Sequence, residues 1–365
     1  GSLCSLGHKV TAMLPLRSKA LVEKYSFARR LTSITVELPQ ESVELEVYDG
    51  RLPNGMDVRL LGNDDLFIDR PAITDDEDEP LRHAAFVRGA LTLASTEGVQ
   101  KGGWHVIHAF GLPAAFAPLF APKTPRFNET KRVLSLDTLE HQGRCDKSWV
   151  DRIGLDWSEY TPEGFEFWDQ LSILKAGLVN ADMILLPSHR MSLDVRTAEG
   201  GYGFEGVMNA RVEETTALLP GINHSVWNPA TDMFLSMHFD AEQQGGKNSC
   251  KAQLQHQLEL PVQLDKTLLG LVPPCSELAP ALGTVARRLL RADIQLVAPK
   301  GLDPRLDGPL DELRESFPRQ VARPELTDSL LHQLLAGADL VALDRPVKFD
   351  GELLMAAYRY GTFPV

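Results

Sequence analysis

Three polar residues lie close together directly after a predicted strand and could act together on a substrate. Asp137, Glu140 and His141 follow the apolar run Arg132–Leu136. A carboxylate and an imidazole so placed can transfer protons as general base and general acid, and glycoside hydrolysis uses a pair of carboxyl groups in this way. The sequence assigns no partner carboxylate to this group. Solvation of a strand end is therefore the favoured interpretation, and hydrolytic chemistry is the weaker one.

The histidine and cysteine positions predict neither a metal centre nor a disulfide. His105 and His108 lie three residues apart on a predicted strand, which places their side chains on opposite faces. The cysteines are scattered, form no Cys-x-x-Cys pair and have no histidine at zinc-ligand spacing; they are Cys4, Cys145, Cys250 and Cys275. We expect reduced structural cysteines, no metal and no cofactor.

Short apolar runs that alternate with helical periodicity would position these side chains. Strands are predicted at Lys9–Leu16, Val43–Tyr48, Val58–Leu61, His105–Ala109, Arg132–Leu136, Met183–Leu186, Thr216–Leu219, Thr267–Val272, Ile294–Pro299 and Asp339–Leu343. Helices are predicted at Leu81–Ser95, Phe165–Asn180, Lys247–Leu258, Ala279–Arg291, Leu326–Ala336 and Gly351–Tyr360. This alternation indicates an α/β protein with parallel sheets covered on both faces. Gln253–Lys266 is predicted to link two such domains.

Composition and charge disfavour several classes of function. The 365 residues are 43% hydrophobic and 24% charged, which suits two cored domains. A net charge of −13 disfavours nucleic acid and anionic membranes, which both reward clusters of lysine and arginine. No apolar run approaches the roughly 20 residues that span a bilayer, and the first residues do not resemble a signal peptide, so a cytoplasmic protein is expected. The acidic run Asp75–Glu79 is predicted to be a solvated loop, with a docking strip for a basic partner as the alternative.

A series of short motifs, collinear over nearly all of the chain, resembles the motifs of bacterial glycogen and starch synthases. They are Gly7–Val10, Asp65–Pro71, Leu171–Leu178, Tyr202–Val207, Thr215–Asp232, Ala336–Asp339 and Tyr360–Val365. A single match of this kind would be weak. Several in the same order, with similar spacings, indicate common descent and therefore a shared fold.

The resemblance implies the GT-B fold, which is α/β with two doubly wound Rossmann-like domains facing across a cleft. It places an N-terminal, acceptor-side domain at residues 1–258 and a C-terminal, nucleotide-side domain at residues 259–365. The family's first strand and its Lys-x-Gly-Gly-Leu loop would precede Gly1, and another strand would begin after Val365. Both domains are therefore expected to be shortened. Members of the family transfer glucose from ADP-glucose or UDP-glucose to an α-1,4-glucan.

The residues that perform this transfer in the family are replaced in this chain. The Arg and Lys that neutralise the leaving diphosphate fall on Pro274 and Ala279, and the essential Glu falls on Val347 or Lys348. Asp137 stands in place of a sugar-contacting His. Loss of one charge-stabilising donor typically costs about 10²–10³ in rate, and losses within one constellation are not additive. The resemblance therefore predicts no catalytic residue and no measurable transfer.

Two further departures affect groups that hold sugar in the family. The family's His-Asp-Trp-His falls on Phe110–Pro113, which removes its charged and hydrogen-bonding side chains. Pro220 replaces an Asn near the hinge, and proline has no amide donor. The sugar-binding surface is therefore expected to be reduced as well.

The favoured function is a pseudo-glycosyltransferase that serves as a structural, scaffold or regulatory subunit with protein partners in a larger assembly. An active glucosyltransferase with a rebuilt site is the first alternative, and an α-glucan-binding module is the second. Thr362 is the expected residual contact on the donor side, and Glu205, Gly206 and Trp227 are the expected residual glucan contacts. No nucleic acid partner and no membrane span are expected.

Overall fold

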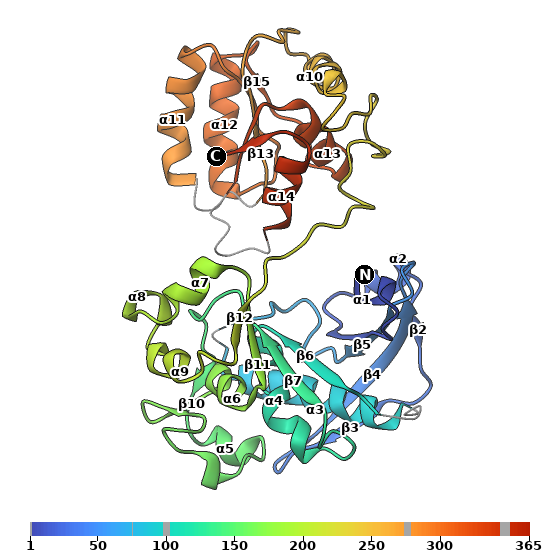
Figure 1. Ribbon diagram of the computed structural model, residues 1–365, viewed down its shortest axis with the longest axis vertical. Helices are drawn as coiled ribbons and strands as arrows, with labels where there is room; N and C mark the ends of the chain where they lie inside the picture. The colour runs from blue at the N-terminus through green and yellow to red at the C-terminus, as the bar shows by residue number, and fades with distance from the viewer. Residues whose placement is uncertain (1, 75, 98–102, 274–278, 344–350) are drawn as a thin grey trace. The chain divides into compact units, whose positions relative to one another are not determined.

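The computed structural model describes residues 2–74, 76–97, 103–273, 279–343 and 351–365. Contacts between residues divide the chain into two compact units, unit 1 (Gly1–Leu219) and unit 2 (Pro220–Val365). Both units carry helices on β-sheets (Figure 1), which confirms the predicted α/β class, although only some of the sheets are parallel throughout. Within the described residues, no helix combines the length and the apolar character that crossing a membrane requires.

The strands of unit 1 form two main sheets and one small one. They are β1 (Thr11–Pro15), β2 (Ala28–Arg29), β3 (Ile34–Glu37), β4 (Ser42–Arg51), β5 (Asp57–Gly62), β6 (Val106–Phe110), β7 (Lys131–Ser135), β8 (Arg144–Cys145), β9 (Glu166–Phe167), β10 (Gln170–Ser172), β11 (Met183–Leu186) and β12 (Thr215–Ala217). The first sheet has the order β1-β5-β4-β2 with β3 on β4, the second has the order β12-β11-β7-β6, and β8-β10-β9 form the small sheet. β4 is antiparallel to its neighbours, so the first sheet is mixed rather than purely parallel.

The helices of unit 1 are mostly short, apart from α3. They are α1 (Ser2–Ser5), α2 (Ala20–Lys24), α3 (Glu79–Thr96), α4 (Ala117–Phe120), α5 (Trp149–Arg152), α6 (Ile173–Asn180), α7 (His189–Asp194), α8 (Ala198–Gly201) and α9 (Glu205–Ala210), with 3₁₀ turns η1 (Leu112–Ala114), η2 (Ala121–Lys123) and η3 (Trp157–Glu159). One buried apolar cluster includes side chains of α3, α4, α6 and both main sheets. This core makes unit 1 a single packed body.

The predicted helix over Phe165–Asn180 begins later than expected. Its first half forms the hairpin of β9 and β10, because Trp168 and Asp169 adopt φ values of +55° and +58°, which are typical of a tight turn and incompatible with a helix. Helix α6 then begins at Ile173, where the Ser172 hydroxyl accepts a hydrogen bond from the Lys175 amide at 3.2 Å.

Unit 2 is a doubly wound α/β domain with one parallel sheet. Its strands are β13 (Leu268–Leu271), β14 (Gln295–Val297), β15 (Val321–Ala322), β16 (Leu340–Ala342) and β17 (Phe363–Pro364), in the order β15-β14-β13-β16-β17. Its helices are α10 (Gly245–Gln257), α11 (Ala279–Arg291), α12 (Pro304–Ser316), α13 (Asp328–Gly337) and α14 (Glu352–Arg359). One apolar cluster joins the sheet to α11 and α12, and another joins it to α10, α13 and α14, so both faces are covered (Figure 1).

The boundary between the units lies earlier than the predicted residue 258. Trp227, Leu235 and Phe239 share one buried cluster with Leu334 and Tyr360, so the segment that begins at Pro220 packs in unit 2. Helix α10 packs on α13 in the same cluster. The predicted link Gln253–Lys266 is therefore partly helix and belongs to this core.

Candidate functional site

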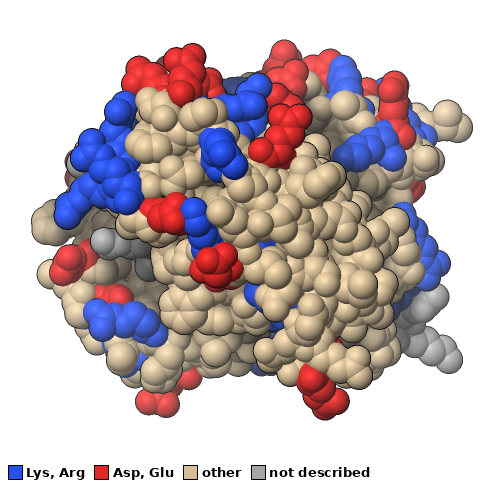
Figure 2. Space-filling model, turned by 90° about the horizontal axis from the view of Figure 1, so that it is seen from above, with Lys and Arg blue, Asp and Glu red and all other residues tan. Residues whose placement is uncertain are grey.

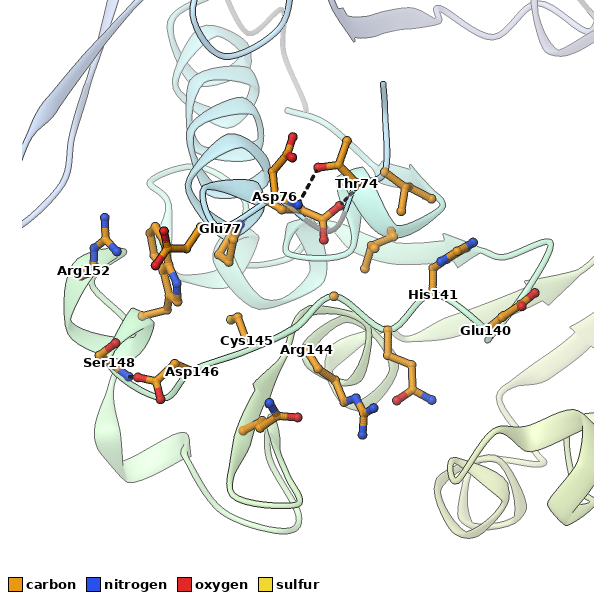
Figure 3. A pocket seen from close by; sticks show the side chains of 18 of the residues that line it. Thr74, Asp76, Glu77, Glu140, His141, Arg144, Cys145, Asp146, Ser148 and Arg152 are labelled. Carbon is orange, nitrogen blue, oxygen red and sulfur yellow. Dashed lines mark hydrogen bonds between the residues drawn. The ribbon is translucent and has the colours of Figure 1, made fainter. Parts of the chain in front are cut away.

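Unit 1 contains a cavity of about 840 Å³ that opens beside the segments following β7 and β6. Its wall combines the loop before α3, the start of α3, the stretch from β7 to α5, and single residues from η1, β10 and the turn after α8. The lining residues are Ile73, Thr74, Asp76, Glu77, Glu79, Pro80, Leu112, Glu140, His141, Gln142, Gly143, Arg144, Cys145, Asp146, Ser148, Trp149, Arg152, Gln170 and Tyr202. In Figure 3, Thr74 and Asp76 lie across the open space from the stretch that carries His141, Arg144 and Asp146. In α/β folds, ligands commonly bind where parallel strands end.

The stretch that forms the cavity floor is fixed to the start of α6. The Gln142 carbonyl accepts hydrogen bonds from the Leu174 amide at 3.1 Å and from the Ser172 hydroxyl at 3.0 Å. Gly143 has a φ of +55°, and a Cβ there would lie 2.9 Å from the Cβ of Ile173. Glycine is therefore required where the chain passes the helix. The Gln142 side-chain amide also donates to the Tyr202 carbonyl at 2.7 Å, which ties the floor to the turn after α8.

Acidic side chains dominate the charge of the cavity wall. Five carboxylates line it, from Asp76, Glu77, Glu79, Glu140 and Asp146, against two guanidinium groups and one imidazole. A hydrogen bond from Arg70 lowers the pKa of Asp76, and hydrogen bonds from Ser148 lower the pKa of Asp146. Both carboxylates therefore remain ionised at neutral pH and can accept hydrogen bonds.

The acidic run before α3 is more ordered than the predicted solvated loop. Asp75 lies outside the described residues. Asp78 pairs with Arg70 through oxygen–nitrogen distances of 2.6 and 2.7 Å, and Glu79 is buried and accepts from the Thr74 amide at 2.8 Å. The prediction of a solvated loop is wrong for Asp78 and Glu79, because Arg70 and the Thr74 amide donate to their carboxylates, whereas Asp76 and Glu77 are exposed.

The cavity offers one exposed aromatic side chain and no activated nucleophile. Tyr202 has 49% of its surface exposed, whereas Trp149 is buried and its ring is covered by the Arg152 guanidinium at 3.6 Å. Burial raises the pKa of the Cys145 thiol to about 12, so it is not a thiolate at neutral pH. No group of histidine, cysteine, aspartate and glutamate side chains in the described part of the chain could hold a metal ion.

The predicted hydrolytic group is only partly assembled at this cavity. Glu140 and His141 line it, whereas Asp137 is exposed and is not part of its wall. The predicted glucan contacts Glu205 and Gly206 also lie outside the lining, at the start of α9, three residues beyond Tyr202. The family motif in Tyr202–Val207 therefore lies beside the cavity, and Tyr202 is the residue of that motif that lines it.

The other two predicted contacts belong to unit 2, and both are engaged in packing. The Trp227 ring stacks on His332 with centroids 4.3 Å apart, and its indole nitrogen donates to Glu352 at 2.8 Å. The Thr362 hydroxyl is buried, lies 3.0 Å from the Ala338 carbonyl and accepts from the Lys247 ammonium at 2.6 Å. These contacts account for both side chains without a ligand.

The switch point of unit 2 lies between β13 and β16, where the winding direction changes. Ligands of doubly wound sheets bind beyond the strand ends at such a point. The positions that the resemblance assigns to the donor site cannot be placed here: Pro274, Val347 and Lys348 lie outside the described residues, and of Ala279 only the backbone, at the start of α11, is described.

The doubly wound unit 2 and the α/β unit 1 fit the GT-B fold. The fold resembles the catalytic domain of starch synthase IV from Arabidopsis thaliana, solved with ADP and acarbose, with a TM-score of 0.78 and 22% identity over 98% of this chain and 82% of that one. The chain belongs to the starch synthase catalytic domain family, whose sequence profile matches residues 1–210. This confirms the family inferred from the short motifs.

Curated relatives in the family are glycogen synthases. The chain is 33% identical over 304 residues to glycogen synthase of Paracidovorax citrulli (strain AAC00-1) and 29% identical over 381 residues to that of Anaeromyxobacter sp. (strain Fw109-5). The first alignment covers 80% of this chain and 59% of the relative, and the second covers 100% of this chain and 77% of the relative. A glycogen synthase of Anaeromyxobacter dehalogenans (strain 2CP-C) is 32% identical, with 62% of its length covered.

Proposed function

We propose that this chain is a glycogen/starch synthase-type protein that binds α-glucan in the cavity of unit 1 and does not transfer glucose. The charge of the cavity wall carries this proposal, since five carboxylates face two guanidinium groups. An ionised carboxylate accepts hydrogen bonds from neutral sugar hydroxyls but repels the diphosphate of a nucleotide sugar. The exposed Tyr202 ring adds an apolar face on which a pyranose can pack.

The donor side supports the absence of transfer. The positions of the two family cations are Pro274 and Ala279, and the position of the family acid is Val347 or Lys348. Neither proline nor alanine can neutralise a diphosphate, and neither valine nor lysine replaces a carboxylic acid. The starch synthase IV structure was solved with ADP and acarbose. For this chain we propose binding of a carbohydrate and not of a nucleotide.

Retardation in a native gel that contains glycogen tests the glucan site. We expect the wild type to be retarded and Tyr202→Ala to lose at least half of the retardation. Trp168→Ala is the matched control, because Trp168 is also exposed, also has a positive φ and does not line the cavity. Equal retardation of all three proteins, or none for the wild type, would refute the glucan site.

A scaffold or regulatory role in a larger assembly is the second candidate. The role predicts that size-exclusion chromatography of native extract recovers the protein with a companion of fixed stoichiometry. Elution as a free monomer at low salt would count against it.

A further inference from the structure

One carboxylate in the cavity wall of unit 1 differs from the others in its burial. Glu79 has 8% of its surface exposed, whereas the other four carboxylates of the wall, from Asp76, Glu77, Glu140 and Asp146, are exposed. Water competes for the oxygen atoms of an exposed carboxylate but has little access to a buried one, so a hydrogen bond to Glu79 is the stronger. Glu79 is therefore the acceptor from which a ligand hydroxyl gains most.

The protein engages only one oxygen of the Glu79 carboxylate. Oε1 accepts a hydrogen bond from the Thr74 amide at 2.8 Å and lies 3.5 Å from Nε2 of His83. Oε2 has no hydrogen-bond partner among the described residues, and the side chain lines the cavity. Polar groups in such surroundings are satisfied by water or by a ligand. Glu79 is thus held through Oε1 and leaves Oε2 for a hydroxyl in the cavity.

His83 lies one turn of α3 behind Glu79 and is the more deeply buried of the two. It has 3% of its surface exposed, and its Nε2 has no hydrogen-bond partner among the described residues. The distance of 3.5 Å between this nitrogen and Oε1 of Glu79 is longer than an ordinary hydrogen bond. A buried nitrogen without a partner is rare. This one is directed at the carboxylate that lines the cavity.

The surroundings of His83 keep its imidazole neutral at neutral pH. Burial lowers the pKa of His83, and the neighbouring Glu79 carboxylate opposes that change. The guanidinium groups of Arg82, on the same helix, and of Arg17, after β1, lower the pKa further. His83 therefore gains its proton only in acidic solution. Once protonated, Nε2 donates a charge-assisted hydrogen bond to Oε1 and neutralises the carboxylate of Glu79.

We propose that Glu79 is the carboxylate that recognises glucan hydroxyls in the unit 1 cavity, and that His83 is a positioning residue that sets how strongly Glu79 accepts. This inference rests on the proposed glucan binding and names the acceptor on which it depends most. With His83 neutral, the charge of Glu79 is available to a sugar hydroxyl. With His83 protonated, that charge is shared with the imidazolium, so the glucan binds less tightly.

Isothermal titration calorimetry with maltoheptaose tests the role of Glu79. Glu79→Gln keeps the size of the side chain and an oxygen for the Thr74 amide, but replaces the acceptor-only carboxylate with an amide that also donates. We expect its dissociation constant to be about tenfold higher than that of the wild type. Glu163→Gln is the matched control, because it removes the same side-chain charge at an exposed position outside the cavity lining, and it should bind as the wild type does.

The outcomes of this titration separate the inference from the glucan site itself. Equal binding by the wild type and by Glu79→Gln would overturn the role of Glu79 and leave the glucan site in place. A loss in Glu163→Gln as large as in Glu79→Gln would show that only net charge matters, and would overturn that role as well. No binding of maltoheptaose by the wild type at millimolar sugar would refute the glucan site, and this inference with it.

The pH dependence of maltoheptaose binding tests the positioning role of His83. From about pH 7.5 to about pH 5, the affinity of the wild type should fall about threefold or more, because His83 gains its proton on acidification. His83→Phe cannot be protonated there and should lose markedly less, whereas His141→Gln, which removes the imidazole that lines the wall, should keep the wild-type loss. A loss that persists in His83→Phe and disappears in His141→Gln would overturn the role of His83.

NMR of the histidine side chains gives a measurement on the wild type alone, so it does not depend on the folding of any variant. Saturating maltoheptaose should move the midpoint of the His83 titration, followed at Cε1, to lower pH, because the glucan binds the form in which His83 is neutral. A threefold difference in affinity corresponds to about half a pH unit. A midpoint that maltoheptaose leaves unchanged, or moves to higher pH, would overturn the proposal.

Discussion

Gly143 is the residue at which the cavity floor depends most on backbone conformation. Its φ of +55° disfavours any L side chain, and a Cβ would lie 2.9 Å from Ile173 and 3.0 Å from Leu112. We expect Gly143→Ala to lower the free energy of unfolding by about 2–4 kcal/mol, because alanine disfavours the left-handed conformation and its Cβ would overlap with Ile173 and Leu112. Urea denaturation measures this change.

Gly206 provides the control for that prediction. It lies in α9 with a helical conformation and has no atom within 4 Å of an added Cβ. Gly206→Ala should be neutral or stabilise the protein by about 0.5 kcal/mol, since alanine favours a helix over glycine. Similar destabilisation by both substitutions would contradict the conformational explanation.

Lys247 is a half-buried lysine whose ammonium group is surrounded by oxygen atoms of unit 2. Its Nζ lies 2.6 Å from the Thr362 hydroxyl and 3.1 Å from the Tyr360 carbonyl, and burial lowers its pKa to about 8. An unfolded lysine titrates near 10.4, so between these values the unfolded chain holds a proton that the folded chain has released. Stability should therefore rise with pH from about 8 to 10.

Comparison with Lys247→Met isolates the contribution of Lys247 to the pH dependence of stability. The wild type should gain about 1–3 kcal/mol of unfolding free energy relative to the variant between pH 7.5 and pH 10, if the unfolded lysine behaves as a free side chain. Urea denaturation at a series of pH values measures the difference. Parallel curves for the two proteins would show that Lys247 has no lowered pKa.

Single residues explain why the site could be predicted only in part. The motif resemblance led to Tyr202 by way of its neighbours Glu205 and Gly206, but no pattern in the sequence marks Asp76 and Asp146 as parts of one wall. They come from segments that are far apart in the chain and meet only after α3 and α6 pack. Trp227 and Thr362 match family motifs, and their hydrogen bonds inside unit 2 are visible only in the structure.

Among the elements, most of the predicted strands lie within one or two residues of an observed strand because β-branched apolar runs mark them. The short strands β2, β3, β8, β9, β10, β15 and β17 were not predicted. Helix α12 was not predicted, since Gly308 and Pro309 interrupt its sequence. Its folding is explained by the Asp303 cap, which accepts from the Arg305 amide at 2.8 Å, and by the buried face of Leu306, Leu310 and Leu313.

Because α10 packs in the core of unit 2, we expect fragments with and without it to differ in stability. Residues 220–258 contribute Trp227, Leu235, Phe239, Cys250 and Leu254 to the core. Buried side chains of this kind are worth about 1.5–3 kcal/mol each, so their sum is comparable with the whole stability of a domain. A fragment of residues 220–365 should unfold cooperatively on heating, whereas a fragment of residues 259–365 should not.

Calorimetry or near-ultraviolet circular dichroism distinguishes the two fragments. A cooperative transition in the shorter fragment would support the boundary expected from the sequence at residue 258. Failure of both fragments would show that unit 2 depends on unit 1 for its stability.

For the molecule as a whole, the sequence carries a net charge of −13. On the side seen in Figure 2, basic and acidic side chains are intermixed around a broad uncharged area. No basic stripe of the kind that binds nucleic acid appears on that side. The family relation supports the fold, whereas the loss of the relatives' chemistry is our proposal, because function depends on the site and not on the fold.

The central claim is that this member of the family holds a glucan without a working donor site. Isothermal titration calorimetry with ADP-glucose, and separately with UDP-glucose, tests this, because the proposal puts Pro274 and Ala279 where the family has its diphosphate-binding cations. We expect no measurable heat of binding at millimolar donor. A dissociation constant below about 100 μM, which corresponds to −5.5 kcal/mol, would show a functioning donor site and contradict the claim.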